Sequence, residues 1–344
     1  MSLAGETALP HPEKATARQS PADTGSEFTP LLRDVKGQEL LERRTGWYAR
    51  TIVTNAFSLA AVVTGMALIG ASWWVLALAP VLAVLSARTA FIGHDAGHAQ
   101  ISGDRATNRR IGLIHGNLLL GMSYAWWNDK HNRHHANPNH IDKDPDVAAD
   151  VLVFTSEQAA TRTGFRGRLT LLEGLALKLY GFQDLRRQTG RERLVEGALL
   201  VAHIAGYVTL LLTTMPLAHA LVFAALHQAL FGLHLGMAFA PNHKGMDMPD
   251  ADGEKWGHLR RQVLTSRNVK GGVLTDWFLG GLNYQIEHHL FPSMPRPHLR
   301  LARSMVRAHC RDLGIPYAET GLIDSYRQAL RHMHEVGEPL RADI

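Results

Sequence analysis

The sequence predicts an all-α integral membrane protein with four transmembrane helices arranged as two hairpins. From Ile52 to Ala87 no Asp, Glu, Lys or Arg occurs, and a second uncharged run extends from Gly197 to His243. A spanning helix needs about 20 apolar residues, so each run is long enough for two spans joined by a turn. The mean hydropathy of -0.09 averages these runs with very polar segments and does not contradict this prediction.

Each uncharged run is divided by residues that favour a turn. Gly70 to Ser72 interrupt the first run, and Thr213 to Pro216 interrupt the second. A buried hairpin of a soluble protein could explain one such run, but two in the same chain favour a membrane. The expected spans are about residues 52–70, 73–92, 194–213 and 217–240.

The net charge of +5 comes from arginines and lysines that flank the apolar runs. Arg43, Arg44 and Arg50 precede the first hairpin, Arg88 and Arg105 follow it, and neither turn carries a charge. Because cytoplasmic loops are enriched in Lys and Arg, both termini and the segment between the hairpins are expected in the cytoplasm. This distribution favours membrane lipid as a partner and argues against nucleic acid.

A further uncharged segment, from Ile111 to Trp127, could be mistaken for a fifth span. Basic residues stand on both sides of it, with Arg110 before and Lys130 after, so both of its ends are expected on one side of the membrane. We therefore expect an interfacial or re-entrant helix whose tryptophans lie at the level of the lipid headgroups.

Composition divides the chain into three parts. Residues 1–35 are rich in Pro, Ser, Thr, Ala and charge, and are expected to form a disordered tail. Residues 36–320 are expected to form the membrane domain, and residues 321–344 a C-terminal helical tail. The single cysteine, Cys310, excludes an intramolecular disulfide and a metal site built from cysteines. The 20 histidines remain as candidate metal ligands.

Three histidine-rich strings stand next to the expected spans, and their spacing suits metal ligands on helices. HDAGH places two histidines four residues apart, HNRHH has histidines at i, i+3 and i+4, and QIEHH repeats that spacing with Gln285 in the first place. Residues three and four apart lie on one helix face, so each string can direct its side chains at one point. The candidate ligands are His94, His98, His131, His134, His135, His288, His289 and, after the fourth span, His243.

Eight histidines exceed the needs of one metal ion, since structural zinc takes four ligands and catalytic zinc three plus water. The number therefore predicts two metal ions. HExxH is absent, which argues against a zinc protease, and so are the paired Glu-x-x-His motifs of soluble di-iron bundles. Nearby carboxylates are expected to accept hydrogen bonds from the ring N–H groups. Asp95, Asp276 and Glu287 are candidates for this role, with a solvated carboxylate as the alternative for each.

The order of the three strings, together with two apolar hairpins, resembles the membrane fatty acid desaturase family over about residues 44–317. QIEHHLFP is similar to the third box of front-end and related acyl-lipid or acyl-CoA desaturases. The resemblance implies a cytoplasmic helical cap with a non-haem di-iron centre held by the box histidines, O2 as co-substrate, and a cis double bond as product. It also implies a ligand from the end of the fourth span, where His243 matches and Asn242 is the rival. Gln285 stands where many members have a histidine ligand.

The resemblance implies further partners and leaves alternatives. No HPGG string of a fused cytochrome b5 domain is found, so a separate electron carrier such as ferredoxin with its reductase is expected. His234 is a further candidate site residue, because ionisable groups inside spans are often functional. A hydroxylase or ketolase of the same membrane group, acting on a lipid or carotenoid, is an alternative function. A metal transporter is a weaker alternative, because its ligands would lie near the bilayer midplane.

Overall fold

The computed structural model describes residues 27–147, 183–249 and 256–338, and these residues are predominantly helical. Four helical segments in this part of the chain are long and apolar enough to cross a membrane, which confirms the number and approximate position of the expected spans. They are α2 (Thr45–Ile69), η1 with α3 (Trp73–Ala77 and Leu78–Gly97), α8 (Gly190–Thr214) and α9 (Leu217–His243).

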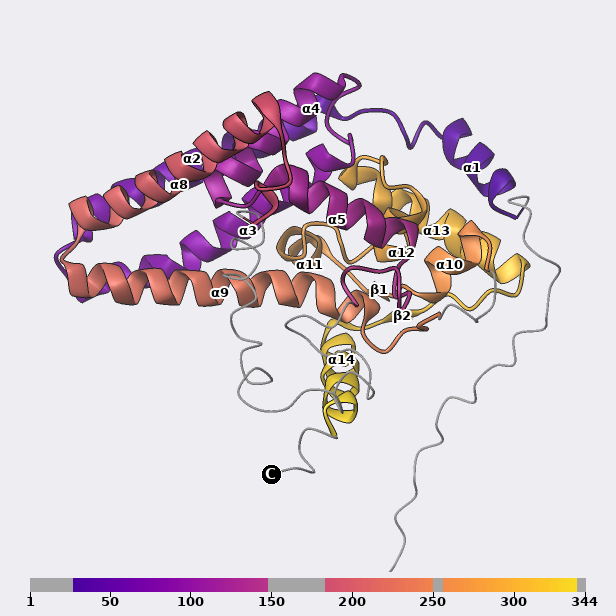
Figure 1. The fold of residues 1–344 in the computed structure, drawn as a ribbon. Coiled ribbons are helices and arrows are strands. Elements are labelled where there is room, and N and C mark those ends of the chain that lie inside the picture. Colours follow the sequence, from indigo (N-terminus) through magenta and orange to yellow (C-terminus); the bar gives the residue numbers. More distant parts are fainter. Residues whose placement is uncertain (1–26, 148–182, 250–255, 339–344) are drawn as a thin grey trace, which may run out of the picture.

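The four long helices run side by side toward one end of the molecule, and the shorter helices gather at the other end (Figure 1). α3 contacts both α2 and α9, and α8 also contacts both α2 and α9, so each of the four helices has two neighbours in the bundle. Buried side chains from all four helices form one apolar core, in which Met66 of α2 and Phe223 of α9 are fully covered. Exposed Leu and Val side chains on α2, α8 and α9 face outward, as lipid-facing residues do.

The connections at the far end of the bundle touch each other. A Cβ atom on Gly70, which ends α2, would lie 1.5 Å from the carbonyl oxygen of Thr214 at the end of α8. Only glycine permits so close an approach. Trp73 of η1 also stacks on His219 of α9, with ring centroids 3.9 Å apart. The turn after α2 therefore packs closely against the turn after α8.

The chain between α3 and α5 packs against α3 along two of its helices. It comprises α4 (Arg105–Gly112), the π-helix η2 (Leu113–Leu120) and α5 (Tyr124–Ala136). Asp104 caps α4 by accepting from the backbone N–H of Thr107 at 2.8 Å. This segment is not among the four membrane-length helices, as predicted for residues 111–127.

A buried carboxylate on α8 holds the turn between η2 and α5. Glu196 is 1% exposed and accepts from Ser123 Oγ at 2.6 Å, from the Ala125 backbone N–H at 3.1 Å and from Asn117 Nδ2 at 3.2 Å. An ionised carboxylate at the start of a helix also interacts favourably with the helix dipole. Glu196 therefore fixes the first turn of α5, which carries the second histidine string.

The cap is a set of short helices over the open end of the bundle. The parallel strands β1 and β2 pair Asn268 with Glu319 and Val269 with Thr320, which ties the two halves of the cap together. The cap elements are α1 (Phe28–Gly37), α10 (His258–Leu264), β1 (Asn268–Val269), α11 (Val273–Phe278), α12 (Gln285–Leu290), α13 (Arg296–Asp312), β2 (Glu319–Thr320) and α14 (Leu322–Val336).

The expectation of a disordered tail up to residue 35 is wrong at its C-terminal end. Helix α1 begins at Phe28, and its Leu31 and Val35 are buried in one core with Val263 and Val306 of the cap. Leu31 and Val35 are four residues apart, so they lie on one face of α1, and this face is buried. The polar residues around this short apolar pattern had favoured the prediction of disorder. Residues 1–26, also assigned to that tail, lie outside the described residues, as do residues 339–344 of the expected helical tail.

Candidate metal centre

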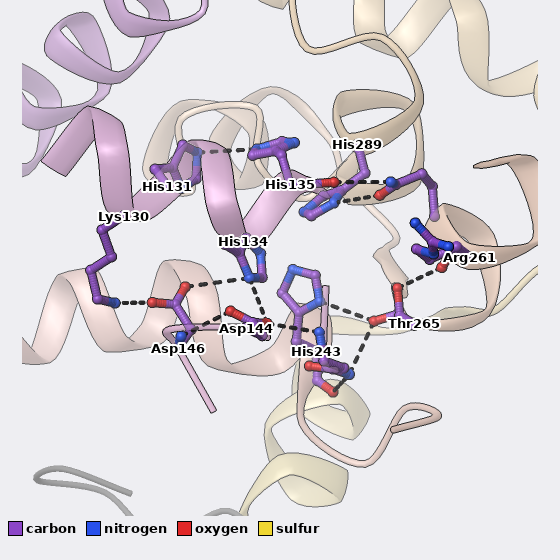
Figure 2. Close-up of polar contacts among 12 residues, drawn as sticks. Lys130, His131, His134, His135, Asp144, Asp146, His243, Arg261, Thr265 and His289 are labelled. Carbon is purple, nitrogen blue, oxygen red and sulfur yellow. Dashed lines mark hydrogen bonds and ion pairs between the residues drawn. The ribbon is translucent and has the colours of Figure 1, made fainter. Parts of the chain in front are cut away.

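The eight candidate histidines lie buried together where α3, α5, α9 and α12 meet. Two groups have ligand nitrogens that all lie within 4.8 Å of one another. The first histidine group is His94, His98, His131 and His288, and the second histidine group is His134, His243 and His289. Figure 2 shows the second group with its polar neighbours.

The spacing of the second string distributes its histidines between the groups. His131 on α5 belongs to the first group, and His134, three residues later, belongs to the second. His135 lies between them: its ring is 4.5 Å from that of His98 and stacks on that of His289 at 4.2 Å. Its Nε2 lies 3.1 Å from His131 Nε2. One helix therefore serves both groups.

Several imidazole nitrogens in these groups are buried without a hydrogen-bond partner in the described part of the chain. Buried polar atoms are normally paired, so a convergent set of unpaired nitrogens indicates an ion. Imidazole suits iron, zinc and copper, and the donor set therefore fits metal ions of this kind. The unpaired atoms are Nε2 of His94, His98, His288 and His289, and Nδ1 of His135 and His288.

Burial keeps these imidazoles neutral. Desolvation, and secondarily the neighbouring imidazoles, lowers the pKa of the box histidines outside the spans well below its ordinary value. A metal ion binds the neutral ring, so these groups need not lose a proton before coordination. The affected residues are His98, His131, His135, His288 and His289.

An ion pair supports the first group. His94 Nδ1 lies 3.0 Å from Asp95 Oδ1, and the other carboxylate oxygen of Asp95 accepts from Arg296 of α13. Asp95 thus leaves Nε2 of His94 directed into the group. Trp127 stacks on His131 with ring centroids 4.5 Å apart. The indole of Trp127, which was expected at the lipid headgroups, thus packs against a histidine of the first group.

Residues from loops and from helix α10 support the second group. His134 Nδ1 lies 2.8 Å from Asp144 Oδ2, and His243 Nδ1 lies 3.0 Å from the carbonyl oxygen of Thr265 (Figure 2). His289 Nδ1 lies 3.0 Å from Gln262 Oε1. Burial raises the pKa of the Asp144 carboxyl, but the His134 imidazole and hydrogen bonds outweigh burial and hold that pKa below its usual value. The acceptors fix the rings with their second nitrogen toward the group.

Gln285 takes part in the second group through an amide contact. Its Nε2 lies 3.0 Å from His243 Nε2, and its Oε1 accepts from Asn242 Nδ2 at 3.1 Å. Asn242 also donates to the carbonyl oxygens of Ala238 and Leu282. His243 therefore lies within the group, whereas the amide nitrogen of Asn242 holds Gln285 in place.

Three of the expected site residues have other contacts. Asp276 accepts from Asn283 at 2.9 Å, and His234 stacks on Phe278 with ring centroids 4.1 Å apart. Glu287 accepts from Asn268 at 2.7 Å and from Tyr317 at 2.8 Å, and burial raises its pKa to about 7. The expectation that Asp276 and Glu287 accept from box histidines is therefore wrong, because both carboxylates join segments of the cap.

Asp144 and Gln262 are not among the predicted site residues. Asp144 lies in the acidic stretch DKDPD that follows HNRHH, and this proximity was a signal that could have identified it. It also accepts from the backbone N–H groups of Asn139 and Asp146, which fold the loop around it. Gln262 had no local signal, because it stands far from any histidine string in the sequence.

Comparison with known proteins gives a family. The family model for fatty acid desaturases matches residues 71–321. An acyl-lipid (9-3)-desaturase of Physcomitrium patens is 28% identical over 88% of this chain and 61% of its own length. A Delta(8)-fatty-acid desaturase of Arabidopsis thaliana is 28% identical over 86% of this chain and 71% of its own length.

A Delta(6)-fatty-acid desaturase of Caenorhabditis elegans is 31% identical over 78% of this chain and 66% of its own length. The chain thus spans 61% to 71% of the length of these relatives. The matched residues include all three histidine strings and both histidine groups. The chain belongs to the fatty acid desaturase family.

Proposed function

We propose that the protein is a membrane-bound desaturase that uses O2 to insert a cis double bond into a fatty acyl chain. One observation carries the proposal: imidazoles from four separate helices converge with unpaired buried nitrogens at one end of an apolar bundle. The names of the relatives agree with it, since they describe desaturases of acyl lipids and fatty acids.

Two iron ions would be held by the two histidine groups, with Gln285 beside the second. When bound, they supply the reduction of O2 and the removal of hydrogen from an unactivated carbon. The protein's own residues orient the ligands. Asp95, Asp144 and Gln262 hold Nδ1 of their histidines, so the opposite nitrogen of each ring would face a bound ion.

The substrate and the topology follow from the same arrangement. An acyl chain, linked to coenzyme A or to a lipid, would reach the centre along the apolar bundle that ends there. The basic residues that flank the spans support a topology with both termini and the histidine groups on the cytoplasmic side. A separate carrier such as ferredoxin, with its reductase, would supply electrons.

Expression in a host that lacks desaturases tests the proposal directly. Mass spectrometry of fatty acid derivatives should show a product two mass units lighter than its precursor, with the double bond located chemically. A product sixteen mass units heavier would instead identify a hydroxylase of the same group. Purified protein should contain about two iron ions per chain. One labile zinc ion and no product would contradict the proposal.

A further inference from the structure

Helix α13 carries a row of arginines along an open pocket of about 620 Å³. Arg300, Arg303, Arg307 and Arg311 recur every three or four residues, so they lie on one helix face. Tyr317, which follows the helix, lines the same pocket. We call this set the arginine pocket.

Half of the positive charge in the arginine pocket is unopposed. Arg303 pairs with Glu319 at 2.6 Å, whereas Arg307 reaches that carboxylate only at 3.8 Å and its side chain is 64% exposed. Arg311 pairs with the neighbouring Asp312 and is 77% exposed. Within the described residues, Arg300 is exposed and forms no ion pair. Two carboxylates thus face four guanidinium groups.

The floor of the pocket connects with the metal centre. The Tyr317 hydroxyl donates to Glu287 Oε1 at 2.8 Å, and Glu287 immediately precedes His288 of the first group and His289 of the second. Asn268 Nδ2 donates to Glu287 Oε2 at 2.7 Å and lies 2.6 Å from the Tyr317 oxygen, which fixes both side chains. One hydrogen bond and one stretch of α12 therefore separate the pocket from the ligands.

Desaturation creates a need for electrons at this centre. The balance is R–CH2–CH2–R′ + O2 + 2 e⁻ + 2 H⁺ → R–CH=CH–R′ + 2 H2O. The acyl chain loses two electrons, O2 gains four, and the remaining two come from a donor that is oxidised. A one-electron carrier protein must therefore bind twice per turnover, close to the histidine groups.

We infer that the arginine pocket is the docking surface for an acidic one-electron carrier protein. The inference rests on the proposed function for the carrier's role, and on the charge and position of the pocket for the site. Complementary charge speeds encounter and sets orientation, and its contribution falls as salt rises. The open, charged rim suits a transient protein partner that must leave after each electron.

The test uses full-length protein in detergent and an acidic plant-type [2Fe–2S] ferredoxin as the probe. The double variant Arg300→Glu and Arg307→Glu reverses the exposed charge and spares Arg303, which pairs with Glu319. The matched control, Arg327→Glu and Arg331→Glu, makes the same change in net charge on exposed positions of α14. Binding is measured by titration at low and high salt.

The pocket variant should bind ferredoxin at least about tenfold more weakly at low salt, with a smaller difference at high salt. The control variant should change binding less than about twofold. Arg300→Ala with Arg307→Ala should give an intermediate loss, which separates charge reversal from misfolding. Unchanged ferredoxin affinity in both pocket variants would overturn the inference.

Activity assays distinguish this inference from the proposed function. With a small chemical reductant in place of ferredoxin, the pocket variants should form product at the wild-type rate. If the pocket variants bind ferredoxin more weakly but the wild-type protein forms no product, the docking proposal is supported and the proposed function is refuted. A raised KM for acyl-coenzyme A with unchanged ferredoxin affinity would make the pocket a phosphate subsite and refute the docking proposal.

Discussion

The first and second histidine groups contain the same kind of donor but are supported differently. The first has four imidazoles and one ion pair behind them, Asp95 with Arg296. The second has three imidazoles, the amide of Gln285, and acceptors from Asp144, Gln262 and a backbone carbonyl. One support is a single strong contact between α3 and α13, and the other is several contacts from loop residues and from α10.

This difference predicts different vulnerabilities. Removing one member of a buried ion pair leaves an uncompensated charge and lowers the stability of the whole fold. Removing one polar acceptor releases a single ring and lowers metal affinity. Loss of the support of the first group should therefore destabilise the whole fold. Loss of a support of the second group should weaken metal binding while the protein stays folded.

The largest effect is expected from losing a ligand of either group. His131→Ala removes an imidazole from the first group and His134→Ala from the second, one turn further along α5. Each should lower product formation at least about 100-fold, beyond the effect of losing a hydrogen-bonding support. Fatty acid analysis and metal content measure this, with the exposed His334→Ala on α14 as the control. Wild-type product from either variant would remove that residue from the centre.

Substitutions of the two supporting carboxylates, Asp95 and Asp144, should have different effects on stability and on metal affinity. Asp95→Asn leaves the largely buried Arg296 without its carboxylate and should lower the free energy of unfolding by about 3–5 kcal/mol. Asp144→Asn should lower metal affinity about 10- to 100-fold with a smaller change in Tm. Thermal melts and metal titrations measure both quantities. If Asp144→Asn is the less stable variant, the comparison between the groups is reversed.

Gln285 tests whether the second group needs a fourth donor. Gln285→Ala should lower activity about tenfold, because the amide lies 3.0 Å from His243 Nε2 and its removal opens that side of the group. Gln285→His should retain most of the activity, since an imidazole offers a nitrogen at a similar reach. A loss below about twofold in the alanine variant would give Gln285 a packing role only.

The smallest effect is expected outside both groups. His234→Ala removes a stacking contact with Phe278 and a hydrogen bond to its carbonyl oxygen, and no ligand. The free energy of unfolding should fall by about 1 kcal/mol, and activity should change less than twofold. A Tm measurement and a product assay suffice. A loss comparable with that of His134→Ala would place His234 within the centre.

Local patterns in the sequence predicted the spans and the ligand strings. The length of an uncharged run identifies a membrane helix. The i, i+3, i+4 spacing of His131, His134 and His135 likewise depends on one helix only. The division of those histidines between two groups depends on where α12 and α9 meet α5. That is a tertiary property, and spacing alone does not contain it.

The supports were harder to predict than the ligands. Gln262 reaches His289 from another helix, and Trp127 packs on His131 although its flanking residues suggested a membrane surface. Glu287 stands beside two ligands in the sequence yet turns to Asn268 and Tyr317. Neighbours on a helix point in different directions, so adjacency in the chain misassigned this carboxylate.

The hydrogen bond between Tyr317 and Glu287 has a consequence for biogenesis. The chain leaves the ribosome from its N-terminus, so residues 94 to 135 emerge long before α12 can be fastened by the strand pair and by Tyr317. Neither histidine group can be fully enclosed during that interval. Enclosure of the two histidine groups must therefore follow translation of nearly the whole polypeptide.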